Sequence, residues 1–212
     1  MGTFINGING PIVGKVGKVH GSSRNGKPYV KGPYKKRTKK VSKKESANRD
    51  KFAAAQAWLK PVVDFVRDGF YQYKMTSGAF VAAKGHLLRN AFEGVQPDIW
   101  LNPALVKVST GPLPLSGDIA VERDGRDYLR FTWDGQSVAG GSPYDQVMML
   151  AYDIDNGTAW CNTTGQFRKA GADTLRIDTT TIVGRTYHIY MAFTAADRSQ
   201  QSESVYLGTI QV

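Results

Sequence analysis

The chain has 212 residues, of which 41% are hydrophobic and 11% aromatic, so it can bury a core and is not wholly disordered. A single cysteine, Cys161, excludes an internal disulfide and a zinc cage built from cysteines. The net charge of +10 is unevenly divided: residues 1–60 hold fifteen Lys and Arg against Glu45 and Asp50, a net of +13. The remainder holds thirteen basic and sixteen acidic side chains, a net of −3. A basic N-terminal segment is therefore joined to a neutral-to-acidic body.

Residues 1–45 are rich in Gly, Lys and Asn and have no helical apolar stripe, which predicts a basic extended arm with short strands. Residues 24–27 are the expected hairpin turn. The spacing Gly21-x-x-x-x-Gly26-Lys27 imitates a phosphate-binding loop, but Pro28 stands where that loop needs a Ser or Thr hydroxyl for magnesium. Nucleotide binding by this loop is therefore excluded.

Residues 46–96 change to helical spacing. The apolar side chains of the first helix, 46–68, recur on one face, with Ser46 as the expected N-cap and Pro61 as a break or restart. A second helix is expected at about 77–92, with Ser77 near its start. Both helices are interpreted as packing elements.

Residues 97–116 form a Pro-rich connector with one expected strand at 104–109, and residues 117–212 form a β-sandwich domain. Seven short runs bounded by turn residues predict this sandwich, at 119–122, 128–133, 146–153, 158–162, 174–178, 186–194 and 205–212. The predicted fold class is α+β, mainly β.

Two resemblances accompany these patterns. Residues 184–212, GRTYHIYMAFTAADRSQQSESVYLGTIQV, resemble the last two strands of a fibronectin type III or immunoglobulin-like module. This implies that Tyr187 is the corner tyrosine and Trp133 the buried core tryptophan. Gly-Lys-Val-Gly at 14–17, the basic stretch and Arg-x-Lys-Phe at 49–52 are similar to an uncharacterised family of Bacteroidota. That family implies an organisation but no activity.

Catalytic and metal-binding patterns are weak. His20, His86 and His188 are far apart and lack metal-ligand spacing. Residues 153–157 resemble a calcium loop only faintly and fit a strand end that enters a turn at Asn156-Gly157. We expect no enzyme activity, no cofactor and no metal.

The basic arm is the clearest functional signal. Its cations can neutralise phosphates, and two tyrosines beside them can stack on unpaired bases. An acidic protein partner and simple solvation of the charges remain alternatives. The candidate binding residues are Tyr29, Lys31, Tyr34, Lys35, Lys36, Arg37, Lys39, Lys40, Lys43 and Lys44.

These features lead to the hypothesis of a non-enzymatic structural protein of a large assembly, with a virion (phage or prophage-derived) capsid or tail component as the first choice. Its expected partners are other copies of itself, nucleic acid at the arm and other structural proteins of the assembly. The start of the sequence has no secretory pattern and no run spans a membrane, so we expect synthesis in the cytoplasm and no membrane partner. The alternatives are a soluble nucleic-acid-binding protein of a small oligomer and an adhesion module with a fibronectin-like domain.

Overall fold

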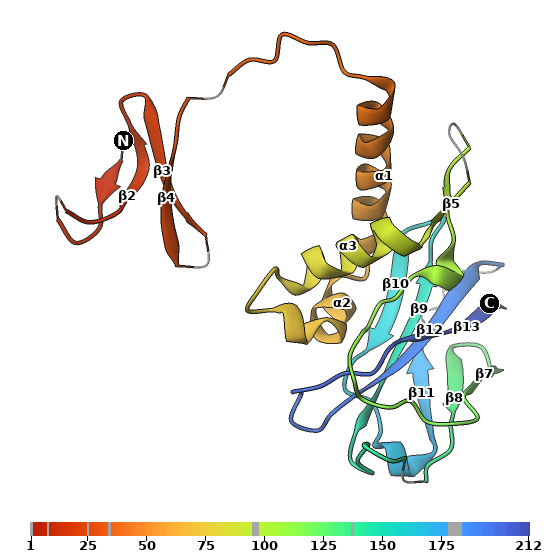
Figure 1. Cartoon of the computed structure of the whole chain (residues 1–212). Coiled ribbons are helices and arrows are strands. Elements are labelled where there is room, and N and C mark those ends of the chain that lie inside the picture. Colours follow the sequence, from red (N-terminus) through yellow and green to blue (C-terminus); the bar gives the residue numbers. More distant parts are fainter. Residues whose placement is uncertain are drawn as a thin grey trace. The chain divides into compact units, whose positions relative to one another are not determined.

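A computed structural model describes residues 2–7, 9–24, 26–33, 35–94, 98–136, 138–177 and 184–212. The chain divides into two compact units, Met1–Ser46 and Ala47–Val212, called here the N-terminal unit and the C-terminal unit (Figure 1). The N-terminal unit carries twelve Lys and Arg against Glu45 alone, a net of +11. The C-terminal unit has sixteen basic and seventeen acidic side chains, a net of −1.

The N-terminal unit is built on a four-stranded antiparallel sheet in the order β1-β2-β3-β4. Its strands are β1 (Thr3–Phe4), β2 (Ile12–Val16), β3 (Val19–Arg24) and β4 (Lys27–Lys31). Gly26 has a φ of 77°, the left-handed conformation that a tight hairpin turn requires, and Arg24 is opposite Lys27. The predicted hairpin is thus confirmed, although Asn25 lies outside the described residues.

The helices follow the N-terminal sheet along the chain, and the first of them starts in the last residues of the N-terminal unit. They are α1 (Lys43–Leu59), α2 (Val63–Gly69), the 3-10 turn η1 (Tyr71–Tyr73) and α3 (Ala79–Asn90). The predicted interruption at Pro61 is confirmed, because α1 ends before it and α2 begins after it. No helix in the described ranges is long and apolar enough to cross a membrane.

The predicted N-cap at Ser46 is wrong. The hydroxyl of Ser42 accepts the backbone N–H of Glu45 at 3.2 Å, and the carbonyl of Ser42 accepts the N–H of Ser46 at 2.9 Å. Ser42 and Glu45 have the Ser-x-x-Glu spacing of a capping box, so the helix begins earlier than its apolar stripe. At α3 the N-cap is Gly78, without a side-chain hydrogen bond, and Ser77 does not cap the helix.

The predicted strand at 104–109 is also wrong. Two short strands, β5 (Phe92–Glu93) and β6 (Trp100–Leu101), precede a 3-10 turn, η2 (Pro103–Leu105). The side chain of Asn102 accepts the N–H of Ala104 at 3.0 Å, which bends the chain there. Val108 is buried, but its N–H donates to the hydroxyl of Ser204 at 3.0 Å instead of joining a sheet.

The remaining chain is a seven-stranded sandwich of a three-stranded sheet, β11-β8-β7, and a four-stranded sheet, β10-β9-β12-β13 (Figure 1). The strands are β7 (Ala120–Asp124), β8 (Tyr128–Thr132), β9 (Gln146–Asp153), β10 (Thr158–Asn162), β11 (Ala172–Arg176), β12 (Thr186–Thr194) and β13 (Val205–Gln211). This confirms the predicted mainly β, α+β class with an immunoglobulin- or fibronectin-like sandwich. Of the predicted residues of β11, Asp178 lies outside the described ones.

Two hydrophobic clusters lie on opposite faces of the four-stranded sheet. Between the sheets, Phe131 and Leu129 of β8 meet Met149 of β9 and Ile189 of β12. On the outer face, Leu150 of β9 and Tyr190 of β12 pack against α1, α2 and α3. The sheet is therefore covered on both sides.

Trp133 and Tyr187, the two aromatic residues expected in the core, are both buried. Trp133 meets Phe193 edge-on at 5.7 Å between ring centroids, and its indole N–H donates to the carbonyl of Arg168 at 2.6 Å.

Candidate nucleic-acid interface

The register of β2, β3 and β4 gathers basic side chains on one face of the N-terminal sheet. Residues directly opposite in an antiparallel pair point to the same face, and the side alternates along each strand. His20 is opposite both Lys15 and Lys31, Ser22 is opposite Tyr29, and Arg24 is opposite Lys27. We call these seven residues the basic face; they are Lys15, His20, Ser22, Arg24, Lys27, Tyr29 and Lys31.

The opposite side of the β3–β4 ladder has a different composition. Its pairs are Gly21 with Val30 and Ser23 with Pro28, so the paired positions of that side carry no charge. The cations of this hairpin are therefore all on one side, together with the aromatic ring of Tyr29.

Tyr29 is the centre of the basic face. The residue is 38% exposed, and Nζ of Lys31 lies 5.1 Å from the centroid of its ring. Hydrogen bonding by Ser22, and next by Lys31, lowers the pKa of the phenol below its ordinary value. The ring is thus held among polar and cationic groups at an open surface.

Two hollows lie along this sheet. One, of about 760 Å³, is lined by Arg24, Lys27, Pro28, Tyr29 and Lys31. The other, of about 380 Å³, is lined by Lys15, Gly17, Lys18, Val19, His20, Gly32 and Pro33. Both hollows have cationic walls without a carboxylate, because residues 1–44 contain no Asp or Glu.

The predicted cations beyond β4 lie in a different setting. Lys35, Lys36, Lys39 and Lys40 are exposed in an irregular segment that leads into α1. Lys43 and Lys44 occupy the first turn of α1, where the helix dipole disfavours positive charge. The helix thus gives these two lysines no local stabilisation.

Arg37 is engaged within the segment. Its guanidinium forms a bidentate ion pair with Glu45 and also donates to the carbonyl oxygens of Lys39 and Lys40, at 2.8 and 3.2 Å. The ion pair raises the pKa of Arg37 above its ordinary value. Arg37 therefore links the segment before α1 to the first turn of that helix.

The structure brings together only two of the predicted binding residues on the sheet, Tyr29 and Lys31. Tyr34 lies outside the described residues. Sequence reasoning missed Lys15, Arg24 and Lys27 as members of the same surface. The signal was present in the alternation Lys27-x-Tyr29-x-Lys31, which places three side chains on one face of a strand.

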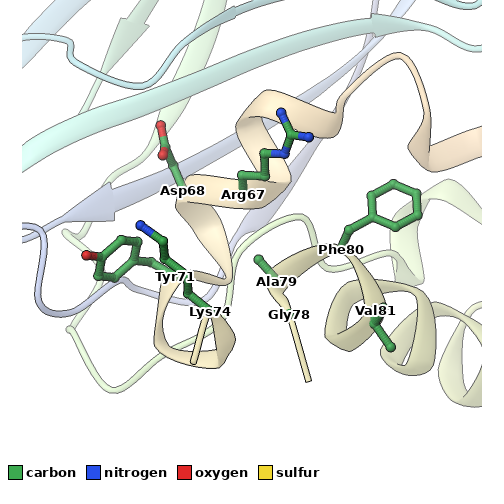
Figure 2. A pocket seen from close by; sticks show the side chains of 8 residues that line it. All are labelled: Arg67, Asp68, Tyr71, Lys74, Gly78, Ala79, Phe80 and Val81. Carbon is green, nitrogen blue, oxygen red and sulfur yellow. The ribbon is translucent and has the colours of Figure 1, made fainter. Parts of the chain in front are cut away.

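A separate hollow of about 380 Å³ lies in the C-terminal unit between α2, η1 and the start of α3. Figure 2 shows its lining, with Asp68 and Tyr71 on one side and Phe80 and Val81 on the other. Lys74 reaches over the ring of Tyr71 at 5.1 Å, and Arg67 pairs with Asp64 at 3.1 Å. These mixed charges are partly engaged with one another and do not form a surface of one sign.

The described residues offer no group of side chains suited to a metal ion. In the described ranges no three His, Cys, Asp or Glu side chains lie close enough to share an ion. The expected turn after the strand end at Asp153 is confirmed: Asp153 accepts the backbone N–H and the side-chain amide of Asn156, at 3.1 and 2.7 Å. Cys161 lies on β10 and is exposed.

Comparison with known proteins gives a family but no activity. No curated protein matches the chain. The match to a family described as a family of unknown function (DUF6266) spans residues 11–208, which includes β2–β4 of the basic sheet, the helices and almost all of the sandwich. The chain therefore belongs to this family of unknown function.

Proposed function

We propose that the protein is a non-enzymatic structural component of a large assembly, in which the N-terminal unit binds nucleic acid. The observation that carries this proposal is the basic face, where four Lys and Arg side chains, a histidine and an exposed tyrosine share one side of a small sheet. The C-terminal unit, with a net charge of −1, serves as the scaffold.

Nucleic acid fits this surface better than an acidic protein does. A polyanion with regularly spaced phosphates can use the two cations that flank Tyr29, because Lys27 and Lys31 lie four residues apart on the same face of β4. An aromatic ring among the cations can also stack on a nucleic-acid base, whereas the carboxylates of an acidic protein cannot stack on it. The exposed lysines at 35–44 extend the positive charge beyond the sheet.

Exposed apolar side chains on the helices of the C-terminal unit, and in the turn between η1 and α3, favour contacts with further subunits. Phe52, Tyr71 and Val81 are exposed, and Met75 is 87% exposed. Tyr71 and Val81 line the same hollow, and exposed apolar side chains that lie in one region mark protein contact surfaces. A particle of the virion type, derived from a phage or prophage, is the assembly we propose, because a compact sandwich with a basic arm suits a shell that encloses nucleic acid.

The nucleic-acid part is tested by the salt dependence of binding. The full chain is titrated with a fluorescent oligonucleotide from 50 to 300 mM salt, and we expect log K to fall linearly with log[salt] by about 0.7–0.9 per phosphate contact. Lys27→Gln/Lys31→Gln should reduce that slope by about 1.5. The control Lys60→Gln/Lys74→Gln removes two exposed charges from the C-terminal unit and should leave the slope unchanged.

The assembly part is tested separately by electron microscopy of the purified protein before and after nuclease treatment. Regular large particles support it. A monomer at every concentration rules out the assembly and leaves the soluble nucleic-acid-binding protein. Absence of oligonucleotide binding at all salt concentrations rules out the nucleic-acid role.

A further inference from the structure

We propose that the ligand of the basic face is an unpaired nucleic-acid strand, with one base stacked on Tyr29 and the neighbouring phosphates held by the cations on either side of it. This inference rests on the proposed function and narrows it. The sequence alone had placed the binding charge mainly at 31–44, whereas this site is formed by three strands of the sheet.

The first argument is the order of side chains across the face. The β3–β4 ladder presents three successive same-face rows: Arg24 with Lys27, then Ser22 with Tyr29, then His20 with Lys31. Lys15 of β2 extends the last row. The aromatic row therefore lies between two cationic rows, about 13 Å apart along β4 at the usual rise of a strand.

The second argument is the freedom of the ring. All five residues of β4 are exposed, so the face around Tyr29 is not used for packing within the sheet. The ring lines the hollow of about 760 Å³ together with Arg24, Lys27 and Lys31. Stacking on an open aromatic ring among cations is how proteins hold single strands without reading their sequence.

The third argument concerns what a duplex cannot do. In a double helix the faces of the bases are stacked on one another, and only their edges and the phosphates meet a flat protein surface. A duplex would contact the cations but leave the ring of Tyr29 without a base. A single strand is flexible enough to use the two cationic rows and the ring together.

The experiment compares three probes on the full chain: a 20-residue oligothymidylate, a hairpin duplex with the same number of phosphates, and inorganic polyphosphate. We expect oligothymidylate to bind more tightly than the duplex. Tyr29→Ala should weaken oligothymidylate binding about 5- to 100-fold, while duplex and polyphosphate binding and the salt slope stay unchanged. Tyr29→Phe should retain the affinity, because the ring is kept.

The control Tyr144→Ala removes another exposed tyrosine that carries a lysine over its ring, Lys169 at 4.4 Å, in the C-terminal unit. It should change none of the three affinities. Equal binding of strand and duplex, with Tyr29→Ala unaltered, overturns this inference but leaves the proposed nucleic-acid role intact. Binding of polyphosphate as tight as that of either nucleic acid overturns both this inference and the proposed nucleic-acid role.

Discussion

At the scale of single residues, Arg168 is the side chain whose role the sequence least reveals. It lies in a short 3-10 turn, η3 (Arg168–Ala170), between the exposed residues Phe167 and Lys169, yet it is itself fully buried. Its guanidinium contacts Asp145 at 3.1 Å, donates to the hydroxyl of Ser116 and the carbonyl of Pro114, each at 2.8 Å, and lies 4.1 Å from the ring centroid of Phe193. Burial lowers the pKa of Arg168, and the carboxylate of Asp145 opposes that effect.

We predict that Arg168→Met lowers the free energy of unfolding by about 3–5 kcal/mol, because Asp145 then stays buried without its cation. The measurement is guanidinium denaturation followed by tryptophan fluorescence, which reports only the C-terminal unit, since all four tryptophans lie there. The matched control is Arg176→Met on the exposed side of β11, expected within about 0.5 kcal/mol of the unaltered protein. Similar losses for both variants would contradict a special role for the buried pair.

At the scale of elements, the sequence predicted correctly those strands whose bounds depend only on residues adjacent in the chain. The bounds of β9, β10 and β12 match the expected runs because apolar stretches and turn residues delimit them locally. The run Gln146–Asp153 also lacks polar alternation, which is typical of a strand buried on both faces, and β9 is buried at seven of its eight positions. Sequence reasoning did not use that signal, so the packing of the helices on the outer face of the sheet was not foreseen.

The predictions that were wrong or incomplete depend on contacts between residues far apart in the sequence. Val108 looks like a strand residue, but its partner is Ser204, 96 residues away, which no local pattern contains. The candidate site shows the same division: the alternation Lys27-x-Tyr29-x-Lys31 was readable, but the position of Lys15 beside them depends on the β2–β3 register. Alternation along one strand predicts which of its side chains share a face. Which strands lie beside each other in the basic face is decided by the pairing between them.

The end of α2 gives a prediction at this scale. A Cβ on Gly69 would collide with the carbonyl oxygen of Val108 and lie 2.9 Å from Cα of Ser109, whereas a Cβ on Gly85, inside α3, meets open space. We therefore expect Gly69→Ala to destabilise by about 1–3 kcal/mol through overpacking against backbone. Gly85→Ala should stabilise by about 1 kcal/mol, because alanine is the better helix former. Thermal denaturation of both variants measures the two stability changes. Stabilisation by Gly69→Ala would contradict the prediction and show that residues 106–110 move to make room for the Cβ.

At the scale of the whole molecule, charge and core are divided between the two units. The N-terminal unit carries the net positive charge, while the residues of both hydrophobic clusters lie at Ala55 and beyond. Binding and stability are therefore expected to be separable properties of the chain. A basic unit with little buried apolar surface can be adapted to a polyanion without changing the core that holds the sandwich.

This separation predicts that a chain of residues 42–212 folds and keeps its melting temperature within about 4 °C, while its affinity for oligonucleotides is lost. The cut preserves Ser42, whose hydroxyl caps α1. It removes the ion pair between Arg37 and Glu45, but those side chains are 40% and 33% exposed, and pairs of this kind contribute at most about 1 kcal/mol. Tryptophan fluorescence follows unfolding in both chains, and anisotropy follows binding. A fall in melting temperature of more than about 5 °C would mean that the N-terminal unit supports the fold, and retained affinity would move the binding surface to the C-terminal unit.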